Sequence, residues 1–387
     1  MSKPLLTIIL PTMNRCNLLK LAVNSILNQT DKKDLEVIIV NNSSVDDTKK
    51  YLLTINDKLF KIYHNEKKLN ISENWQKALK LSTGKYFYVL GDDDYLFPNF
   101  VESIKQIIKN KSPDLLMISK IDYVQQDSIY GWQDIVFSEK KYTSEISSIE
   151  PKKLMYSYLN FASDKYLPLT PHPSLFIIKD ELRVNVEKYT NCPFFHTVYP
   201  DYFAFIGCGL KAKNMLFYDK ELVCIGGVEQ KNYCYDNSKI EAFLNLDDYE
   251  NDENKYLLKM PYLSTSIYYQ ILKNINIYSL ENIEKDSLKK TAYKLALDNV
   301  LWCKYKYKNN KYNIDLNYFK DALGDEVYNK ILKEFKFKIL KANINKILLR
   351  TFSNFYMILR NYLSKKILFL KYKNVKNIEE VVVRYLK

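Results

Sequence analysis

The chain has 387 residues and a net charge of +13, with 58 Lys and Arg against 45 Asp and Glu. This length is enough for one large domain with an appendage. The excess charge is local, because residues 330–387 contain 15 basic and three acidic residues. The remainder is close to neutral, with 43 basic and 42 acidic residues, which argues against a body that binds nucleic acid.

The cysteines and the apolar runs exclude further classes of protein. The six cysteines are scattered, without a C-x-x-C pair or a nearby His at zinc spacing, so we expect reduced thiols. The N-terminal apolar run is broken by Pro11 and is too short for a secretory signal. No run approaches the roughly 18–20 apolar residues that a membrane-spanning helix needs. We therefore expect a cytoplasmic protein, soluble or peripheral to a membrane.

The first 110 residues alternate between two patterns. Apolar, β-rich runs predict strands at 5–10, 35–40, 61–64 and 85–90. Apolar residues at helical spacing predict helices at 18–29, where Asn14 is the candidate cap, and at 46–53, 72–81 and 100–109. Strands that alternate with helices of this length form right-handed βαβ units and a parallel sheet.

Beyond residue 110 the pattern is more varied. It predicts strands at 114–119, 174–178 and 216–225, helices at 154–161 and 202–209, and a polar excursion at 125–148. From about residue 237 the pattern is helical to the C-terminus. We expect an α/β domain at 1–235, with halves at 1–110 and 111–235, followed by a helical, basic region at 236–387.

Three consecutive aspartates, Asp92, Asp93 and Asp94, directly follow the fourth predicted strand. Neighbouring carboxylates at the end of a buried strand repel one another, and a bound cation relieves that repulsion. Oxygen ligands suit Mg²⁺ or Mn²⁺, which such sites commonly share with substrate phosphates. On its own, however, a run of this kind is more often a solvated acidic turn.

Two earlier strands bring polar residues to the same edge of the predicted sheet. Pro11 and Thr12 end the first strand, and Asn41 and Asn42 end the second. The carboxyl ends of parallel strands meet at one edge, where ligands bind in open α/β sheets. This convergence favours a metal and nucleotide site over a solvated turn.

The order of five short motifs resembles that of the family-2 glycosyltransferases, which are inverting enzymes of the GT-A fold. The motifs are P-x-x-N-R at 11–15, V-N-N-S-S at 40–44, N-x-S-x-N at 70–74, T-G-K at 83–85 and the acidic run at 92–94. The resemblance is close over residues 5–110, thinner to about 230 and absent beyond. It implies a Rossmann-like GT-A domain that binds a nucleotide sugar, with a mostly parallel central sheet.

The resemblance also implies roles for individual residues. It makes Asp94 the direct ligand of Mn²⁺ or Mg²⁺. Asp92 or Asp93 then faces the ribose or a metal-bound water, and Asp92 is also a candidate metal ligand. The other candidate donor-binding residues are Pro11, Thr12, Asn14, Arg15, Asn42, Ser44 and Asn74. For Arg15, contact with the diphosphate and a plain surface position both stay open.

Two positions depart from the family pattern. Asn42 stands where the family usually has an aspartate that accepts a hydrogen bond from the uracil ring. Asparagine accepts through its carbonyl and also donates, so the choice of nucleotide stays open. Gly91 stands where a D-x-D-D metal motif has its first aspartate.

The implied reaction is a direct displacement at the anomeric carbon of the donor sugar. The cation offsets the charge of the departing phosphate, and a carboxylate on the opposite face takes the proton from the acceptor hydroxyl. Asp201 is the best match to that base, although the acid that usually precedes it is missing, and its alternative role is a helix N-cap. His172, between two prolines, either lines the acceptor or phosphate site or forms a rigid polar turn.

Between residues 335 and 370 apolar and basic residues recur at helical spacing. A cationic amphipathic helix can lie on an anionic leaflet, where each basic residue adds about 1 kcal/mol. Contact of this kind through 331–387 brings an enzyme to lipid-linked acceptors. The alternative is that the apolar stripe packs on the catalytic domain while the lysines stay solvated.

These observations predict a metal-dependent glycosyltransferase that moves a sugar from a nucleotide-sugar donor to a glycan or lipid-linked acceptor. The resemblance suggests bacterial surface polysaccharide or lipooligosaccharide biosynthesis, at the inner face of the cell membrane. Two rivals stay open: a sugar nucleotidyltransferase, although residues 11–15 lack its usual glycines, and a catalytically degenerate scaffold of a glycan-assembly complex. The sequence does not identify the donor sugar, the acceptor or the oligomeric state.

Overall fold

The computed structural model describes residues 3–124, 135–139, 143–152, 155, 172–197, 199–227, 275–278, 290–291, 293–294, 296–298, 300–301, 316–351, 367–371 and 377–386. The chain divides into two compact units. The first consists of Met1–Gln230 together with Leu368–Lys387, and the second of Lys231–Ile367.

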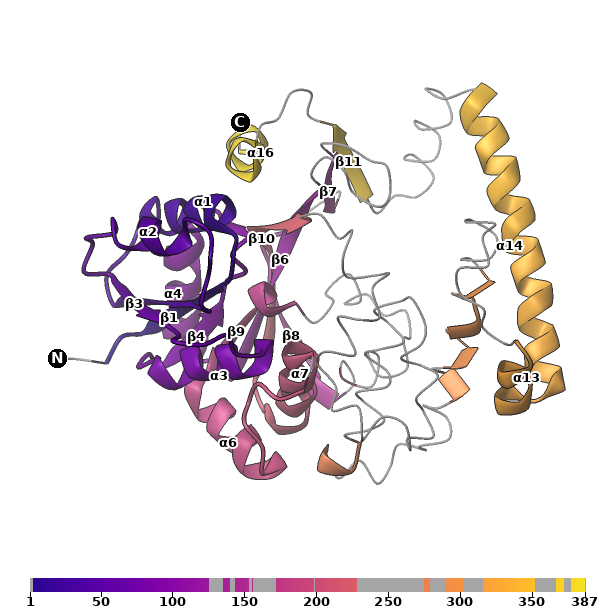
Figure 1. Cartoon of the computed structure of the whole chain (residues 1–387), viewed down its shortest axis with the longest axis horizontal. Coiled ribbons are helices and arrows are strands. Elements are labelled where there is room, and N and C mark those ends of the chain that lie inside the picture. Colours follow the sequence, from indigo (N-terminus) through magenta and orange to yellow (C-terminus); the bar gives the residue numbers. More distant parts are fainter. Residues whose placement is uncertain are drawn as a thin grey trace. The chain divides into compact units, whose positions relative to one another are not determined.

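The first unit is an α/β domain (Figure 1). Its strands are β1 (Leu6–Thr12), β2 (Leu35–Asn41), β3 (Phe60–His64), β4 (Tyr86–Val89), β5 (Tyr95–Leu96), β6 (Leu115–Val124), β7 (Ile135–Glu139), β8 (Ile146–Ile149), β9 (Phe176–Lys179) and β10 (Met215–Gly227), joined by β11 (Ile367–Lys371). Its helices are α1 (Cys16–Leu27), α2 (Thr48–Leu52), α3 (Ile71–Leu81), α4 (Phe100–Lys111), the short η1 (Pro173–Leu175), α6 (Asp180–Thr190), α7 (Pro200–Lys211) and α16 (Ile378–Tyr385).

All of these strands belong to one sheet with the order β11-β7-β6-β9-β4-β1-β2-β3, and β10 pairs with β5, β6 and β8. The β3-β2-β1-β4 half is wholly parallel. In the other half β9 runs antiparallel to β4 and β6, whereas β10 runs parallel to β6. The predicted α/β class and parallel central sheet are therefore confirmed, and the carboxyl ends of β1, β2 and β4 lie at one edge.

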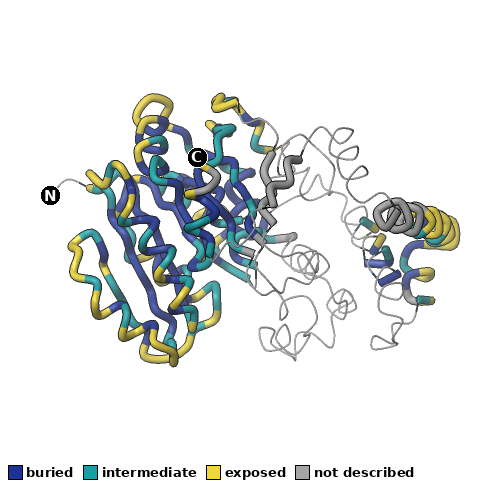
Figure 2. Tube along the Cα trace, turned by 90° about the horizontal axis from the view of Figure 1, so that it is seen from above, coloured by how far each residue is buried: buried dark blue, intermediate teal, exposed yellow. Residues whose placement is uncertain are grey.

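Both faces of the central strands are covered, and every residue of β1 is buried. Strands buried on both faces are largely apolar, as β1, β2 and β4 are, and the polar Thr7 and Glu36 within them bond to each other. Helix α4 packs on the face that carries Tyr88, whose ring centroid lies 4.7 Å from that of Phe100. On the opposite face Phe87 stacks edge-on against Phe194 at 5.6 Å. Figure 2 shows the resulting buried centre, with exposed residues on the outer helices, the turns and the edge strands.

A buried carboxylate ties the amino ends of the parallel strands together. Glu36, 3% exposed, accepts hydrogen bonds from Thr7 Oγ1, from the backbone and side chain of Thr83, and from Lys61 Nζ. Burial raises its pKa, but these donors outweigh that effect and the pKa lies below its usual value. A Cβ at Gly84 would lie 2.5 Å from Thr7 Oγ1, so only glycine allows this approach.

Several predicted elements differ from the observed ones. Helix α1 begins at Cys16, and the predicted cap Asn14 instead adopts φ +56° and bonds to the neighbouring loop. Within the polar excursion, the described residues form the strands β7 and β8. The C-terminal region, expected to be helical throughout, contains the strand β11. Apart from Met155, the predicted helix at 154–161 lies outside the described residues.

The C-terminal helix α16 belongs to the first unit, although the sequence suggested one contiguous C-terminal region from residue 236. Its residues Val381 and Val382 are buried in a cluster with Phe97 and Tyr95. Glu379 Oε1 accepts hydrogen bonds from Asn24 Nδ2 at 2.6 Å and Tyr95 Oη at 3.3 Å. Helix α16 thus packs against β5, the short strand that directly follows the acidic run in the sequence.

The second unit contains η3 (Ile275–Tyr278), α13 (Asn317–Leu323) and the long helix α14 (Asp325–Thr351). In α14, Ile331 and Phe335 lie one turn apart and are buried, whereas Phe337 and Leu340 are 69% and 56% exposed. No helix in the described part of the chain is both long enough and apolar enough to cross a membrane.

Candidate active site

The three aspartates lie just beyond the carboxyl end of β4 and are largely enclosed. The side chains of Asp92 and Asp94 are 8% and 1% exposed, and that of Asp93 is 22% exposed. Burial raises the pKa of each carboxyl to about 6, and the neighbouring negative charges add to this effect. The cluster is therefore stable as a charged group only where donors or cations compensate it.

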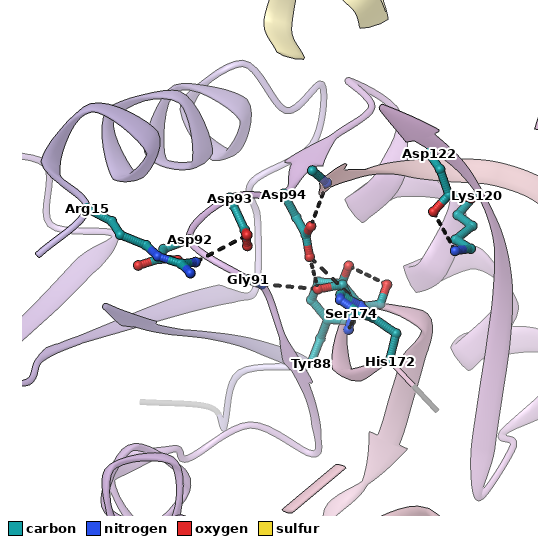
Figure 3. A network of polar contacts seen from close by, with 11 residues as sticks. Arg15, Tyr88, Gly91, Asp92, Asp93, Asp94, Lys120, Asp122, His172 and Ser174 are labelled. Carbon is teal, nitrogen blue, oxygen red and sulfur yellow. Dashed lines mark hydrogen bonds and ion pairs between the residues drawn. The ribbon is translucent and has the colours of Figure 1, made fainter. Parts of the chain in front are cut away.

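Arg15 and Thr12 compensate one side of this cluster (Figure 3). Arg15 Nη1 lies 3.0 Å from Asp92 Oδ1 and 3.2 Å from Asp93 Oδ2. Thr12 Oγ1 donates to Asp92 Oδ2 at 2.8 Å. The first motif and the acidic run are thus brought together, as the parallel sheet predicts. In this structure Arg15 binds carboxylates, so it is not a plain surface residue.

Asp94 is held on the other side of the loop. Its Oδ2 accepts a hydrogen bond from Ser174 Oγ, and its Oδ1 accepts one from the backbone of Gly226 at 3.0 Å. Both oxygens of the predicted direct metal ligand are therefore engaged by the protein, although each keeps a further lone pair.

His172 approaches this side of the loop as a neutral ring. Its Nδ1 accepts a hydrogen bond from the backbone of Ser174 at 3.3 Å. Burial lowers the pKa of His172 to about 3, with a smaller contribution from the charge of Lys120. The 3.9 Å distance from Nδ1 to Asp94 Oδ2 is therefore not an ion pair. Lys120 itself pairs with Asp122 at 2.5 Å on the neighbouring strand β6 (Figure 3).

Asn42 faces the loop after β3. Its Oδ1 accepts from the backbone of Leu69 at 2.8 Å and from Asn65 Nδ2 at 2.9 Å, while its Nδ2 donates to the Leu69 carbonyl at 2.9 Å. Asn65 also donates to Asn74 Oδ1 at 2.8 Å. The predicted donor-binding residues Asn42 and Asn74 are thus joined through Asn65, and the Asn42 amide is committed to fixing this loop.

The remaining predicted donor residues lie around the turn after β2. Asn14 Oδ1 accepts from the backbone of Val45 at 2.7 Å, and the Asn14 backbone donates to Ser44 Oγ at 2.9 Å. Pro11 is buried within β1 next to Val40 of β2. These contacts join the first two predicted motifs at the same sheet edge.

Asp201 lies in the first turn of α7, apart from the hydrogen-bonded cluster around the aspartates. The N-cap of α7 is Tyr199, so the alternative reading of Asp201 as the cap is wrong. The Asp201 side chain faces a largely apolar pocket whose walls include Val89 and Pro173, close in sequence to the acidic loop and to Ser174. Burial raises the pKa of Asp201 to about 7.

Three residues of this network were not predicted from the sequence. Asn65 follows a parallel strand, so the rule that identified Asn41 could have found it. Ser174 and Gly226 come from η1 and β10, far from the motifs in sequence, and carry no local signal of a site.

The carboxylates of the acidic loop differ from a complete set of metal ligands. Among the described residues, no group of three or more His, Cys, Asp or Glu side chains is arranged to hold a metal ion. A Mg²⁺ or Mn²⁺ that is bound largely through substrate phosphates needs only one or two carboxylates. The oxygen-only donors at Asp92–Asp94 fit a cation shared with a substrate diphosphate and do not fit a preformed metal cage.

The domain has one sheet that is covered on both faces, with polar loops at the carboxyl edge of its parallel strands. This is the architecture of the GT-A type. Residues 7–167 match the family model described as Glycosyl transferase family 2. This confirms the resemblance read from the five motifs.

Two relatives that are named as glycosyltransferases align with part of this chain. An uncharacterized glycosyltransferase of Rickettsia prowazekii is 30% identical over 158 residues, which cover 41% of this chain and 48% of the relative. A Campylobacter jejuni protein named GalNAc(5)-diNAcBac-PP-undecaprenol beta-1,3-glucosyltransferase is 36% identical over 106 residues, 27% of this chain and 34% of the relative. The chain thus spans about half the length of these relatives or less.

A solved structure shares the fold at low sequence identity. S. aureus TarS 1–349 in complex with UDP-GlcNAc superposes with a TM-score of 0.53 at 14% identity, covering 96% of this chain and 98% of that one. A similarity at this level supports the GT-A architecture.

The Asn42 contacts give a testable prediction. The substitution Asn42→Asp restores the usual family residue but sets a carboxylate oxygen against the Leu69 carbonyl, in a site that is 5% exposed. We expect a loss of about 1–3 kcal/mol in the free energy of unfolding, because a buried hydrogen bond is replaced by a repulsion. Urea unfolding measures this, with the exposed Asn70→Asp as control; equal stability of the two variants would contradict the assigned role.

Proposed function

We propose that this protein transfers a sugar from a nucleoside diphosphate sugar to a hydroxyl group of a glycan or lipid-linked acceptor. The observation that carries the proposal is the acidic loop Asp92–Asp94, joined by Arg15 and Thr12 at the carboxyl edge of the parallel sheet. Ligands of open α/β sheets bind at this edge. The named activities of the relatives support transfer over the rival nucleotidyltransferase reaction.

The donor is proposed to lie across the ends of β1, β2 and β4. The TarS complexes contain UDP-GlcNAc or UDP, which supports a nucleotide-sugar donor for this fold. Arg15 is well placed to move from the carboxylates to a diphosphate, since a guanidinium forms paired hydrogen bonds with either anion. Because Asn42 is occupied by Leu69, recognition of the base requires either backbone groups of this loop or a rearrangement of Asn42.

Mn²⁺ or Mg²⁺ is the proposed cofactor, held by the acidic loop together with the donor diphosphate. The sequence favours Asp94 and Asp92 as ligands, and the greater exposure of Asp93 makes it a third candidate. When bound, the cation would offset negative charge on the leaving diphosphate. Arg15 would contribute a second positive charge next to it.

Asp201 is the proposed general base. A base must be unprotonated and near the acceptor hydroxyl, and a pKa near the working pH makes proton transfer efficient. Asp201 is partly buried, and this desolvation raises its pKa to about 7, which suits this role. Its pocket is lined by Val89, at the end of the strand that leads into the acidic loop, and by Pro173, directly before Ser174 in η1.

The acceptor class is proposed from the relatives alone. The C. jejuni relative is named for transfer to a diphospho-undecaprenol-linked glycan, and chondroitin synthase of Pasteurella multocida is 32% identical over 154 residues. A role in bacterial surface polysaccharide or lipooligosaccharide synthesis at the cytoplasmic face of the membrane is consistent with both.

The first test is a panel of nucleotide sugars. Purified protein is heated with each sugar nucleotide in the presence and absence of Mn²⁺, and a ligand at 100 times its Kd stabilises the folded state by about 2.7 kcal/mol. We expect a raised melting temperature for at least one donor, dependent on Mn²⁺ and lost in Asp93→Asn or Asp94→Asn. Asp57→Asn, in an exposed turn, is the matched control. If no sugar nucleotide binds with or without the metal, the proposed function is wrong.

The pKa of Asp201 predicts the pH dependence of the reaction. Below pH 7 Asp201 is increasingly protonated and cannot accept the acceptor proton, so kcat/KM should fall tenfold per pH unit and level off above about pH 7. Asp201→Asn should lower kcat by about 10²–10⁴-fold. Asp180→Asn, in the first turn of the neighbouring helix α6, serves as control. A flat profile from pH 5.5 to 8, or an active Asp201→Asn enzyme, would remove Asp201 from the mechanism.

Peripheral membrane contact through 331–387 is a second proposal. In α14, Lys333 and Lys336 are exposed beside the exposed Phe337 and Leu340, a combination that suits an anionic leaflet. Helix α16 lies in the same segment but packs into the first unit, so deleting 331–387 would damage the domain itself.

Point substitutions therefore test membrane contact best. The double variant Lys333→Gln/Lys336→Gln should partition about 30-fold less onto anionic vesicles, because each lost charge removes about 1 kcal/mol. Lys67→Gln/Lys68→Gln, two exposed lysines of the first unit, is the matched control. Co-sedimentation with phosphatidylglycerol vesicles measures the effect, and equal binding of both variants would favour solvated lysines with no membrane role.

A further inference from the structure

Ser174 lies where the two halves of the first unit meet at the acidic loop. It belongs to η1, directly before β9, which is antiparallel to β4 with Tyr88 opposite Ile177. Continued by three residues, this register sets Ser174 opposite Gly91. The Gly91 backbone indeed donates to Ser174 Oγ at 3.0 Å.

Every polar group of Ser174 has a partner in the structure, and the residue is completely buried. Its hydroxyl accepts from Gly91 and donates to Asp94 Oδ2, and its carbonyl accepts from Tyr88 Oη at 2.8 Å. Its backbone donates to His172 Nδ1. Figure 3 shows Ser174 between the loop and His172, on the side of Asp94 opposite to Arg15.

Gly91 makes this arrangement possible. A Cβ at this position would lie 2.7 Å from Asp94 Oδ2 and 3.0 Å from Asp93 Oδ1. The Asp94 carboxylate therefore folds back over residue 91 and reaches Ser174 only because position 91 has no side chain. The departure of Gly91 from the D-x-D-D pattern and the contact with Ser174 are two parts of one arrangement.

We propose that Ser174 is a positioning residue that fixes the Asp94 carboxylate, and with it the whole acidic loop, for binding of the cation and diphosphate. This inference rests on the proposed function. Groups that hydrogen-bond a ligating carboxylate fix its orientation, and their loss typically costs 10–100-fold in metal affinity or activity. Because Asp94 is also bonded to Gly226, the loop is held between η1 and β10.

The first experiment needs no ligand. Ser174→Ala removes the acceptor of the Gly91 N–H and the donor to Asp94 while leaving the backbone bonds intact. We expect hydrogen–deuterium exchange at Gly91 to become about tenfold faster, with exchange in β1 and β2 unchanged. Ser25→Ala is the matched control, because Ser25 is also a buried serine whose hydroxyl bonds within its own helix, to the Ala22 carbonyl. Unchanged exchange at Gly91 would overturn the proposal.

The second experiment separates positioning from a purely structural contact. The donor identified by the panel is titrated with Mn²⁺. We expect Ser174→Ala to need about tenfold more Mn²⁺ than the wild-type protein for half-maximal binding of this donor. The melting temperature of Ser174→Ala should be no lower than that of Ser25→Ala. Gly91→Ala should have the same effect on Mn²⁺, since its Cβ displaces the same carboxylate. Ser174→Cys, which keeps a weak donor, should need a Mn²⁺ concentration between those of the wild-type protein and Ser174→Ala. It replaces Ser174→Ala if that variant does not fold.

The outcomes distinguish this inference from the proposed function. If the wild-type protein binds a sugar nucleotide with Mn²⁺ and Ser174→Ala binds both equally well, the function stands and the positioning role is wrong, even if Gly91 exchanges faster. If the wild-type protein binds no sugar nucleotide, the function fails and the positioning role fails with it.

Discussion

The structure depends on how three adjacent carboxylates are kept in place at the edge of a parallel sheet. Burial raises the pKa of Asp92, Asp93 and Asp94 to about 6, although neighbouring donors and Arg15 act in the opposite direction and favour the charged form. On one side of the loop, Thr12 at the end of β1 and Arg15 at the start of α1 supply positive charge or donors. On the other side, Ser174 of η1 and Gly226 of β10 donate to Asp94. Arg15 pairs with two of the three carboxylates, so the loop keeps an excess of negative charge that a divalent ion would offset.

The fold assembles this site from distant segments. Parallel pairing of β1 with β2 and β4 brings the ends of three strands together, and the antiparallel strand β9 adds a segment more than 80 residues further along. At the opposite ends of the strands Glu36 binds Thr7, Thr83 and Lys61, so the amino edge is fixed by a buried network of its own. A rigid sheet between these two networks is what allows hydrogen bonds to set the geometry of the loop.

The sequence predicted the parallel half of the sheet and the meeting of residues 11–15 with the acidic run, because strand periodicity and strand order determine both. It did not predict Ser174 or Gly226, since antiparallel pairing of β9 and the long course of β10 leave no local pattern. The partner of Asn42 was missed for a related reason: its amide bonds to the backbone of Leu69, and a backbone partner has no signature in the sequence. The return of α16 to the first unit depends on tertiary packing of Val381 and Val382, which a helical pattern alone does not locate.

The central claim is that the acidic loop binds a divalent cation together with a nucleoside diphosphate. A crystal grown with UDP and Mn²⁺, with diffraction recorded at the manganese absorption edge, tests it most directly. The account predicts an anomalous peak about 2.0–2.6 Å from a carboxylate oxygen of Asp92, Asp93 or Asp94 and from an oxygen of the diphosphate. A nucleotide bound away from the ends of β1, β2 and β4, or bound there with no manganese at the loop, would contradict it.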